Sequence, residues 1–514
     1  MSGPGGERMN GVLPEGWLSC RIADVVQPVP NTRPEDTPDR EFGYLDISAI
    51  SNRTYTIGEV RRFRGADAPS RARRPIAPGD VLFSNVRTYL RNVALVPDDL
   101  AAELCSTGFT VLRTNGAVDP SFLFRYVLTD EFIGAVTPLQ TGSNYPATSD
   151  RVVMEQVIPL APLAEQRRIV AAVEALLARV DAARQRLARV PEILKRFRQA
   201  VLAAACSGVL TDDWRAAATL NQTVPSLQAL CELRRASWKS RSKGRFCEPQ
   251  PLGCPTAIPR TWLWATLDHV VAAGPQNGLY KPGTSYGEGM PIVRIDDYQD
   301  GWTRARSQLT RLRLSDAEAL TYSLHPGDIL INRVNSLTHL GKALLVDEAL
   351  CPAVFESNMM RFSLLPGVAP AWAHLYLRSS QGKDRLIARR KWAVNQASIN
   401  QSDVLATPIP LPPLEEQHEI VRRVQALFAL ADSVEQRVAP ASARADRLTQ
   451  AILSKAFRGE LVPTEAELAR REGREYEPAA VLLERIRAER EARGARGKAG
   501  QKPGSRGAQV RLRL

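Results

Sequence analysis

The chain contains one long unit written twice, and this repeat limits the fold more than any other feature of its 514 residues. Pro-Leu-Ala-Pro-Leu-Ala-Glu-Gln begins at Pro159, and Pro-Leu-Pro-Pro-Leu-Glu-Glu-Gln begins 251 positions later (410 − 159) at Pro410. The match continues without a gap to Leu210 and Leu461. Repeats of this size are tandem domains, because solenoid repeats run to about 20–50 residues. The chain therefore carries two versions of one architecture.

Upstream of these blocks the two copies agree only at landmarks. Trp17 corresponds to Trp262, and the Pro-Gly-Asp turn at 78–82 corresponds to the one at 326–330. Between the landmarks the sequences differ. Each unit is thus a divergent block followed by a near-constant block. This organisation indicates a shape that is held constant while two modules are free to differ in specificity.

The near-constant blocks have the pattern of coiled-coil helices, because apolar residues recur at alternating steps of four and three. A stretch of about 40 helical residues would span ~60 Å. The two patterns match in length and phase, so we expect the helices to pack on each other; the alternative is two amphipathic helices, each buried on its own domain. The seam positions are Ile169, Val173, Leu176 and Leu187 in the first block, and Ile420, Val424, Leu427 and Val438 in the second.

Two prolines and two glycines interrupt or end these patterns. Pro191 and Pro440 fall inside them, and each should kink or divide its helix, giving two helical segments per block. Gly208 and Gly459 are expected to terminate the helices.

The divergent blocks mix β-branched runs, turn signals and short amphipathic stretches, which predicts the α+β class. Strands are expected at 43–47, 79–83, 291–295 and 327–331, and helices at 121–128 and 371–377. The predicted organisation is a first divergent domain at 12–158, a helical block at 159–210, a connector at 211–256, a second divergent domain at 257–409, a helical block at 410–461, a C-terminal helix at 462–492 and a basic, disordered tail at 493–514.

The net charge of +13 suits a polyanionic partner, but it is unevenly placed. Residues 493–514 carry seven basic and no acidic side chains, which leaves only +6 (13 − 7) for the body. The seven cysteines include no C-x-x-C pair, so reduced thiols in a cytoplasmic protein are expected rather than a disulfide framework or a zinc finger. The first ten residues lack a signal-peptide core, and no apolar run reaches the ~18 residues of a membrane span.

Catalytic motifs are missing from the sequence. Methylation of adenine in DNA needs a motif of the Asn-Pro-Pro-Tyr type, and Asn144-Tyr145-Pro146 has the wrong order. Gly341-Lys342 lacks the rest of a phosphate-binding loop. The five histidines are scattered without metal-ligand spacing. A chain of this size without a catalytic constellation is expected to be a binding or scaffold component.

With these features in place, the chain resembles the specificity subunits of type I restriction–modification systems. Two divergent domains, each followed by a helix that opens with the motif at Pro410, are typical of that family. So are the stretches 455–462 and 477–487. The resemblance covers nearly the whole chain, from Leu13 to about Arg493. The first copy departs mildly, with Ala161 and Ala164 in place of Pro and Glu, and these changes spare the seam.

The resemblance implies a function and a set of partners. Each divergent block would be a target-recognition domain that reads one half of a two-part DNA site. The helices would pack antiparallel as a spacer and dock two methyltransferase subunits, which nuclease–translocase subunits would join. S-adenosylmethionine, ATP and Mg²⁺ would belong to these partners, and this chain would hold no cofactor and no metal.

Direct readout of bases needs Arg, Lys, Asn or Gln at base edges, and phosphate contacts need basic or hydroxyl groups. Polar loops that follow the two Gly-Asp turns, and further polar clusters in each domain, meet this requirement. The DNA-binding candidates are Asn85, Arg87, Tyr89, Arg91, Gln140, Asn144 and Tyr145 in the first domain, and Gln276, Asn277, Lys281, Asn332, Arg333, Asn335, Arg390, Lys391, Trp392, Asn395 and Gln396 in the second.

Two other functions stay open at this point. The chain could be an enzyme, a methyltransferase or fused nuclease with unrecognised motifs, in which case it would bind S-adenosylmethionine or modify DNA by itself. It could instead be a coiled-coil scaffold without DNA specificity, which would bind no DNA sequence even with its partners present.

Overall fold

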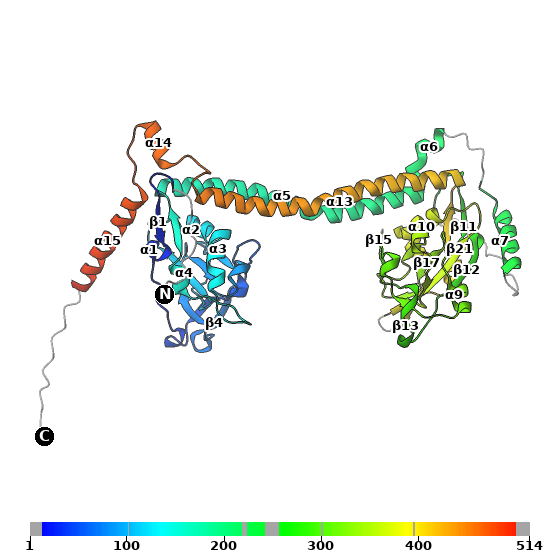
Figure 1. The fold of residues 1–514 in the computed structure, drawn as a ribbon, viewed down its shortest axis with the longest axis horizontal. Coiled ribbons are helices and arrows are strands. Elements are labelled where there is room, and N and C mark those ends of the chain that lie inside the picture. Colours follow the sequence, from blue (N-terminus) through cyan, green and yellow to red (C-terminus); the bar gives the residue numbers. More distant parts are fainter. Residues whose placement is uncertain are drawn as a thin grey trace, which may run out of the picture. The chain divides into compact units, whose positions relative to one another are not determined.

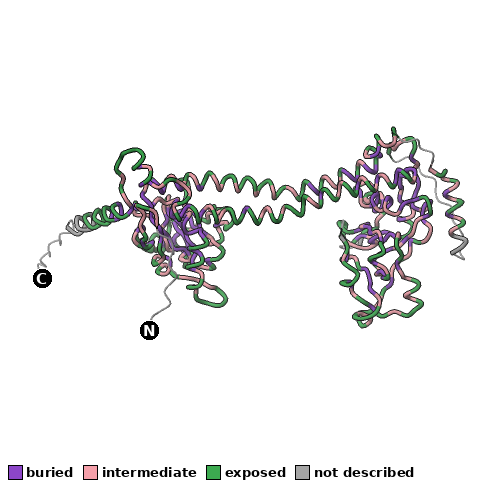
Figure 2. Tube along the Cα trace, turned by 45° about the horizontal axis from the view of Figure 1, so that its top comes forward, coloured by how far each residue is buried: buried purple, intermediate pink, exposed green. Residues whose placement is uncertain are grey.

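The computed structural model describes residues 13–100, 102–217, 224–241, 256–299, 302–393 and 396–499. The chain forms two compact units: unit 1 joins Met1–Leu187 to Pro440–Leu514, and unit 2 is Ala188–Ala439. Each unit holds one divergent block and one segment from each of two long helices, α5 (Leu163–Ser207) and α13 (Leu414–Phe457). Buried residues concentrate inside the domain of each unit (Figure 2).

Unit 1 contains two four-stranded sheets and a short strand pair (Figure 1). The first sheet has the order β2-β9-β6-β7 and the second the order β4-β3-β8-β5, in which only β3 and β8 run parallel. The strands are β1 (Leu18–Arg21), which pairs with β10 (Val157–Leu160), β2 (Val26–Gln27), β3 (Glu41–Leu45), β4 (Arg61–Arg64), β5 (Ala72–Pro75), β6 (Val81–Ser84), β7 (Val93–Leu95), β8 (Leu104–Ser106) and β9 (Phe109–Thr114).

Unit 2 repeats the first sheet of this topology and most of the second, and it adds the strand pair β14-β15 and the sheet β18-β23-β22. The sheet β12-β21-β17-β19 corresponds to the first sheet of unit 1. The sheet β16-β13-β20, in which β13 and β20 are parallel, corresponds to the second. The strands are β11 (Leu263–Thr266), which pairs with β24 (Pro408–Leu411), β12 (Val271–Asn277), β13 (Tyr286–Val293), β14 (Tyr298–Gln299), β15 (Trp302–Thr303), β16 (Arg311–Leu312), β17 (Ile329–Asn332), β18 (Val334–Asn335), β19 (Ala343–Leu345), β20 (Val354–Phe355), β21 (Met359–Leu364), β22 (Lys391–Ala393) and β23 (Gln396–Ser398).

Short helices cover the sheets, and local sequence fixes where they begin. Asp119 accepts backbone N–H groups at the start of α2, and Pro120 occupies the first helical position, where its missing N–H costs nothing. Unit 1 has α1 (Ile22–Val25), α2 (Pro120–Tyr126), α3 (Asp130–Val136), α4 (Asp150–Met154), α14 (Glu465–Glu472) and α15 (Ala479–Ala499); unit 2 has α6 (Asp212–Ala217), α7 (Leu227–Arg241), α8 (Leu267–Val270), α9 (Asp316–Tyr322), α10 (Pro370–Arg378), α11 (Ser380–Leu386) and α12 (Gln401–Leu405). The α+β class is confirmed.

The predicted division of the long helices at Pro191 and Pro440 was wrong. Each proline lies inside an uninterrupted helix. Proline removes one backbone hydrogen bond, to the carbonyl four residues before it. Both prolines are exposed, so water can bond the freed carbonyl, and packing along the rest of the helix outweighs the single loss. Gly208 and Gly459 do follow the helix ends, with φ of 81° and 73° in the left-handed region.

The two long helices pack antiparallel in each unit, as predicted. In unit 1, Arg184 of α5 donates hydrogen bonds to Asp446 (2.8 Å) and Thr449 (2.9 Å) of α13. In unit 2, Arg198 of α5 donates to Asp432 of α13 at 2.7 Å. A later residue of α5 therefore meets an earlier residue of α13. The alternative of two helices that pack only on their own domains is excluded.

The seam is deepest where the helices meet a domain. In unit 1, Ile169 and Val173 are buried in the core that also holds Phe457. In unit 2, Ile420 and Val424 are buried in the core around Trp372. The other four seam candidates, Leu176, Leu187, Leu427 and Val438, are half-buried, as expected for a two-helix contact that no third layer covers.

Helix α15 continues to Ala499, past the boundary at 493 that the sequence predicted for the basic tail. Residues 500–514 lie outside the described residues. Among the helices of the described ranges, none combines the length and the apolar character that a membrane crossing requires.

Candidate nucleic-acid interface

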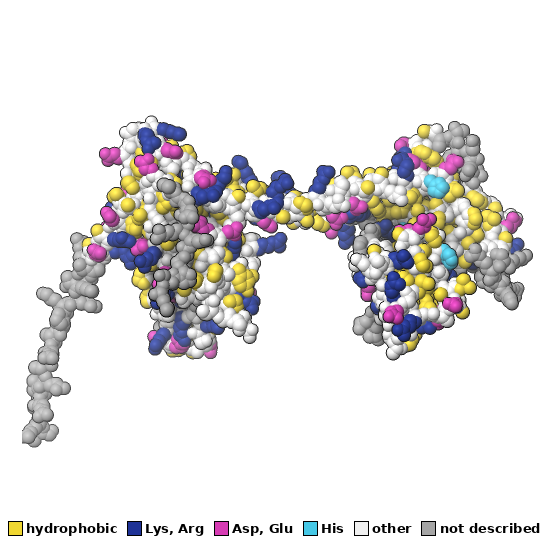
Figure 3. Space-filling view, viewed as in Figure 1, with side chains coloured by type: hydrophobic (Ala, Val, Ile, Leu, Met, Phe, Trp, Pro, Cys, Tyr) yellow, Lys and Arg dark blue, Asp and Glu magenta, His cyan; other side chains and the backbone are white. Residues whose placement is uncertain are grey.

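Surface charge alone does not mark a nucleic-acid surface on the visible face of either unit. On the face shown in Figure 3, basic and acidic side chains are interspersed over both units. This agrees with the modest charge of the body once the basic tail is set aside. Candidate contacts must therefore be judged one by one, from exposure and from the hydrogen bonds that each side chain already makes.

The first predicted loop of unit 1 leaves the sheet at the end of β6. Its first residue, Asn85, is only 6% exposed. The Asn85 amide donates to Asp150 (3.0 Å) and accepts from the Thr110 hydroxyl (2.7 Å), and Arg74 pairs with the same Asp150. Asn85 thus ties the loop to α4, and its burial does not favour a contact with DNA.

Beyond Asn85 the chain makes a tight 3₁₀ turn, Thr88–Leu90, between two arginines in the left-handed conformation. Arg87 has φ 49° and Arg91 has φ 55°, which is costly for residues with a side chain. Arg91 turns inward, to the carbonyl of Leu128 (3.2 Å) and to Asp130. The turn leaves Tyr89 51% exposed at its tip.

A hairpin at 141–147 supports this turn. Ala147 bridges both Thr141 and Val86 in antiparallel fashion. Gln140, just before the hairpin, accepts from the Thr88 backbone at 3.1 Å and donates to the Thr137 carbonyl at 2.9 Å, so its amide is engaged inside the loop.

Two candidates lie at the tip of this hairpin. Asn144 is exposed there, and Tyr145 is 72% exposed. The guanidinium of Arg87 lies 5.3 Å from the centre of the Tyr145 ring. The exposed set in unit 1 is therefore Arg87, Tyr89, Asn144 and Tyr145.

Unit 2 builds the same feature with other residues. The central strand β17 ends at Asn332, which is fully buried and accepts a hydrogen bond from the Tyr298 hydroxyl. The next residues form β18, which pairs with β23 of the hairpin β22–β23. Like Asn85, Asn332 supports the loop, and its burial does not favour a contact with DNA.

The loop and hairpin of unit 2 also divide into engaged and exposed side chains. Arg333 is half-buried and donates to the Ser357 carbonyl at 3.2 Å, and Asn335 accepts from the backbone of Ser336 at 2.7 Å. Lys391 and Gln396 are exposed on the hairpin. Asn395 lies outside the described residues.

An arginine–aromatic pair occurs at this hairpin too. Trp392 is 64% exposed, and the Arg390 guanidinium lies 5.3 Å from the centre of its ring. Arg390 also donates to the Ile387 carbonyl at 3.2 Å. No pattern in the sequence pointed to the pairing, although all four residues of the two pairs were candidates.

The remaining candidates lie along β12 and the loop that follows it. Gln276 is engaged with Arg361 and with the Thr321 carbonyl. Lys281 pairs with Glu318 at 2.6 Å, and its hydrogen bond lowers the pKa of that carboxyl to about 2. Asn277 is exposed. Tyr280, in the same predicted loop, is 80% exposed beside them.

The Glu-Gln pair that ends each repeated motif anchors a domain to its long helix. In unit 1 the Trp17 indole donates to Glu165 at 2.8 Å, and in unit 2 the Trp262 indole donates to Glu416 at 2.9 Å. All four residues were landmarks of the repeat, but their pairing was not predicted. Burial raises the pKa of the Glu165 carboxyl, although Trp17 donates to it.

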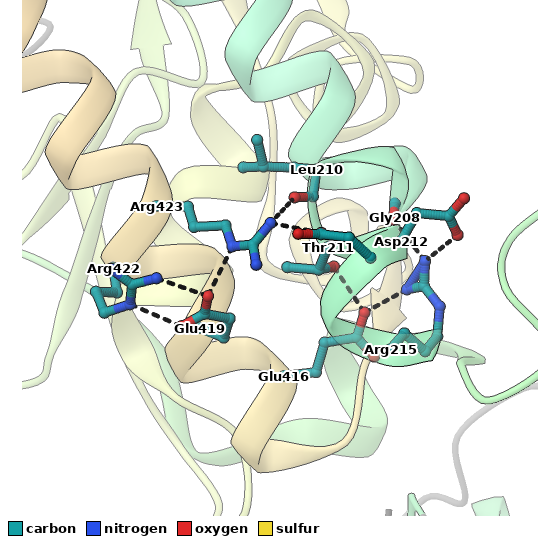
Figure 4. A network of polar contacts seen from close by, with 10 residues as sticks. Gly208, Leu210, Thr211, Asp212, Arg215, Glu416, Glu419, Arg422 and Arg423 are labelled. Atoms are coloured by element: carbon teal, nitrogen blue, oxygen red, sulfur yellow. Dashed lines mark hydrogen bonds and ion pairs between the residues drawn. The ribbon is translucent and has the colours of Figure 1, made fainter. Parts of the chain in front are cut away.

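Further polar contacts surround the anchor of unit 2 (Figure 4). Glu416 also accepts from the Thr211 hydroxyl at 2.8 Å and from Arg215. Two turns later, Arg423 bridges Glu419 (2.6 Å) and Asp213 (2.6 Å). The end of the first copy is thereby tied to the start of α13.

The described residues contain no group of three or more His, Cys, Asp or Glu side chains that could hold a metal ion. Burial raises the pKa of the Cys20, Cys105 and Cys206 thiols to about 12, far above that of a reactive thiolate.

Known proteins are similar to this chain in both sequence and fold. Residues 280–439 match the family model of the type I restriction modification DNA specificity domain. The specificity subunit of the type I restriction enzyme EcoKI of Escherichia coli K12 is 32% identical over 95% of this chain and 98% of its own length.

Two solved structures extend the similarity to three dimensions. The HsdS subunit of Thermoanaerobacter tengcongensis aligns with a TM-score of 0.59 and 29% identity, over 88% of this chain and 99% of its own. A chain from a structural study of complex assembly and conformational transition of the type I R-M system aligns with a TM-score of 0.62 and 28% identity, over 88% of this chain and all of its own.

Proposed function

The chain belongs to the specificity subunits of type I restriction enzymes, and from this premise we propose that its two units read the two separate parts of one asymmetric DNA site. As a specificity subunit it is non-catalytic. The observation that supports the proposal is that the two units share a hairpin-and-loop feature but expose different residues on it. Both units present a hairpin beside the loop after the central strand, but unit 1 exposes Arg87 and Tyr145 there, whereas unit 2 exposes Lys391 and Trp392.

Two modules of the same fold and different exposed residues are expected to read different bases, because base contacts specify sequence while phosphate contacts only position the protein. The proposed contacts in unit 1 are Arg87, Tyr89, Asn144 and Tyr145. Those in unit 2 are Asn277, Arg390, Lys391, Trp392 and Gln396, with Asn395 as a further candidate. Asn85 and Asn332 are proposed as buried supports of the loops.

The partners follow from the same premise. Two adenine methyltransferase subunits would dock on the spacer helices, and nuclease–translocase subunits would join them. S-adenosylmethionine, ATP and Mg²⁺ would be bound by those subunits. The complex would work in the cytoplasm, where its DNA is.

Co-expression with a methyltransferase subunit, followed by genome-wide mapping of methylated adenine, tests the proposal. The expected result is a stable complex with two methyltransferase copies and a motif of two short, unlike blocks that flank an unspecified gap. A continuous or palindromic motif assigned to this protein would refute the two-reader architecture. A product that elutes alone from its cognate partner would refute the assembly.

A further inference from the structure

Arg87 of unit 1 has a fixed backbone but a side chain without a hydrogen-bond partner among the described residues. Its backbone is in the left-handed region, and its backbone N–H donates to the Pro146 carbonyl at 2.8 Å. Its side chain is exposed and makes no hydrogen bond or ion pair with any described residue. Its guanidinium lies over the Tyr145 ring, 5.3 Å from the ring centre. The Arg87 guanidinium therefore lies over an aromatic ring, and none of its N–H groups donates to a described residue.

Unit 2 reaches the same arrangement from different sequence. Arg390 and Trp392 are two residues apart on one hairpin, whereas Arg87 and Tyr145 come from two separate segments. Nη1 of Arg390 donates one hydrogen bond to the Ile387 carbonyl. No hydrogen bond from Nη2 of Arg390 occurs among the described residues. Both rings thus lie on the corresponding hairpin, whereas the two arginines come from different positions of the repeat.

Stabilising the loop is a weak explanation for either pair. A cation–π contact at an exposed site is worth only about 0.5–1 kcal/mol, and holding a long side chain in one place has an entropic cost of similar size. Tyr145 and Trp392 are also 72% and 64% exposed, so neither ring gains much from burial. What the ring does supply is orientation, because a guanidinium that lies over it is restrained before any partner arrives.

We propose that Arg87 and Arg390 are specificity-determining residues, each of which donates two hydrogen bonds to O6 and N7 of a guanine in the major groove, with Tyr145 and Trp392 as positioning residues. The inference rests on the proposed function. Guanine presents two adjacent acceptors at its major-groove edge, and the arginine fork matches them. Lysine, a point charge, does not match them in the same way.

The test uses the full chain in complex with its methyltransferase partner, on a duplex that carries the mapped site. Each guanine of the site is replaced in turn by 7-deazaguanine, which lacks the N7 acceptor. We expect one guanine in each half-site at which this change weakens binding on the order of 10- to 100-fold. Arg87→Ala should abolish the effect in one half-site and leave it intact in the other, and Arg390→Ala should do the reverse.

Two matched variants separate base reading from other roles. Arg87→Lys keeps the charge and should relax the preference for guanine, whereas a phosphate contact would be rescued by lysine. Arg64→Ala removes another exposed arginine of unit 1 that makes no ion pair or side-chain hydrogen bond among the described residues, and it should leave base preference unchanged. Tyr145→Leu should retain the preference in weakened form. Melting curves of each variant confirm folding.

The outcomes distinguish guanine reading by Arg87 and Arg390 from recognition of a two-part DNA site, on which it rests. If the complex binds a two-part site but tolerates 7-deazaguanine everywhere, or if Arg87→Lys behaves as the wild type, the inference fails and the proposed function stands. If the complex prefers no sequence at all, the proposed function fails first.

Discussion

Glu416, at the start of α13, is fully buried and accepts from Trp262, Thr211 and Arg215. Removing one partner from a buried charged pair leaves the other charge unsolvated. We therefore expect Glu416→Ala to lower the free energy of unfolding of unit 2 by about 3–5 kcal/mol. Denaturant titration of the full chain measures this loss. Glu415→Ala, one residue away and exposed, is the control and should be neutral; equal stability of both variants would contradict the role of the anchor.

A second residue-level prediction concerns pH. Burial, with Arg378 nearby, lowers the pKa of His374 to about 3, so the folded protein keeps this imidazole neutral. The unfolded chain takes up the proton at its ordinary pKa near 6.5. Since the unfolded state binds more protons below that pH, stability is lost as pH falls from about 6.5 toward 3, by up to ~1.4 kcal/mol per pH unit.

His374→Gln removes this titration and should flatten the fall in stability between pH 6 and 4. The measurement is the free energy of unfolding of wild type and variant at matched pH values. Carboxyl groups titrate in both proteins, so the difference between the two curves isolates the histidine. Parallel curves would show that His374 does not stay neutral in the folded state.

Sequence reasoning located the loops but could not tell their inward side chains from their outward ones. Asn85 and Asn332 have the residue type and the position of DNA contacts, yet both are buried. What turns them inward are Asp150 and Tyr298, which come from other parts of the chain. The identity of such a partner depends on the tertiary fold, and no local pattern records it.

At the scale of elements, periodicity was the better guide. The heptad pattern predicted both long helices and their packing on each other, because burial of an apolar stripe decides helix formation more than any single residue does. The same balance explains the wrong expectation at Pro191 and Pro440, where one lost hydrogen bond is outweighed by many packed turns. Topology inside the divergent blocks was not predictable, since strand order depends on contacts distant in sequence.

The seam makes a direct prediction at this scale. Val424 is fully buried where α13 meets the core of unit 2. Val424→Asp would bury an unpaired charge and should cost at least several kcal/mol of stability. Gln425→Asp places the same charge one residue away on the exposed face and should be neutral. Thermal unfolding compares the two, and an unaltered melting temperature for Val424→Asp would mean that the seam is not packed.

At the scale of the whole chain, the divergent domain of each unit packs closely on a glycine from the other copy of the repeat. In unit 1, a Cβ added at Gly459 would lie 2.4 Å from Pro14; in unit 2, a Cβ added at Gly208 would lie 2.4 Å from Pro259. Each glycine ends a near-constant block, and each proline begins a divergent one. Beside the apolar core that it shares with the long helices, a divergent domain thus meets the rest of the chain through contacts that recur in both copies, the Pro–Gly approach and the Trp–Glu hydrogen bond.

These recurring contacts predict that a recognition domain can be exchanged as one piece. Residues 257–409 include Pro259 and Trp262, whereas their partners Gly208 and Glu416 stay in the recipient chain. A domain from another family member that retains the proline and the tryptophan should therefore dock without loss of stability. The first divergent domain, 12–158, and its contacts to Glu165 are untouched by the exchange.

The exchange should change one block of the methylated motif and leave the other block intact, because the two half-sites are proposed to be read independently. Mapping of methylated adenine for the hybrid, in complex with the methyltransferase, measures this directly. Exchange of 12–158 instead should alter the opposite block, and Trp262→Phe in the hybrid tests whether docking depends on the indole hydrogen bond. If replacing one domain changes both blocks, then the units do not read DNA separately and the site is recognised by a surface that both domains must build together.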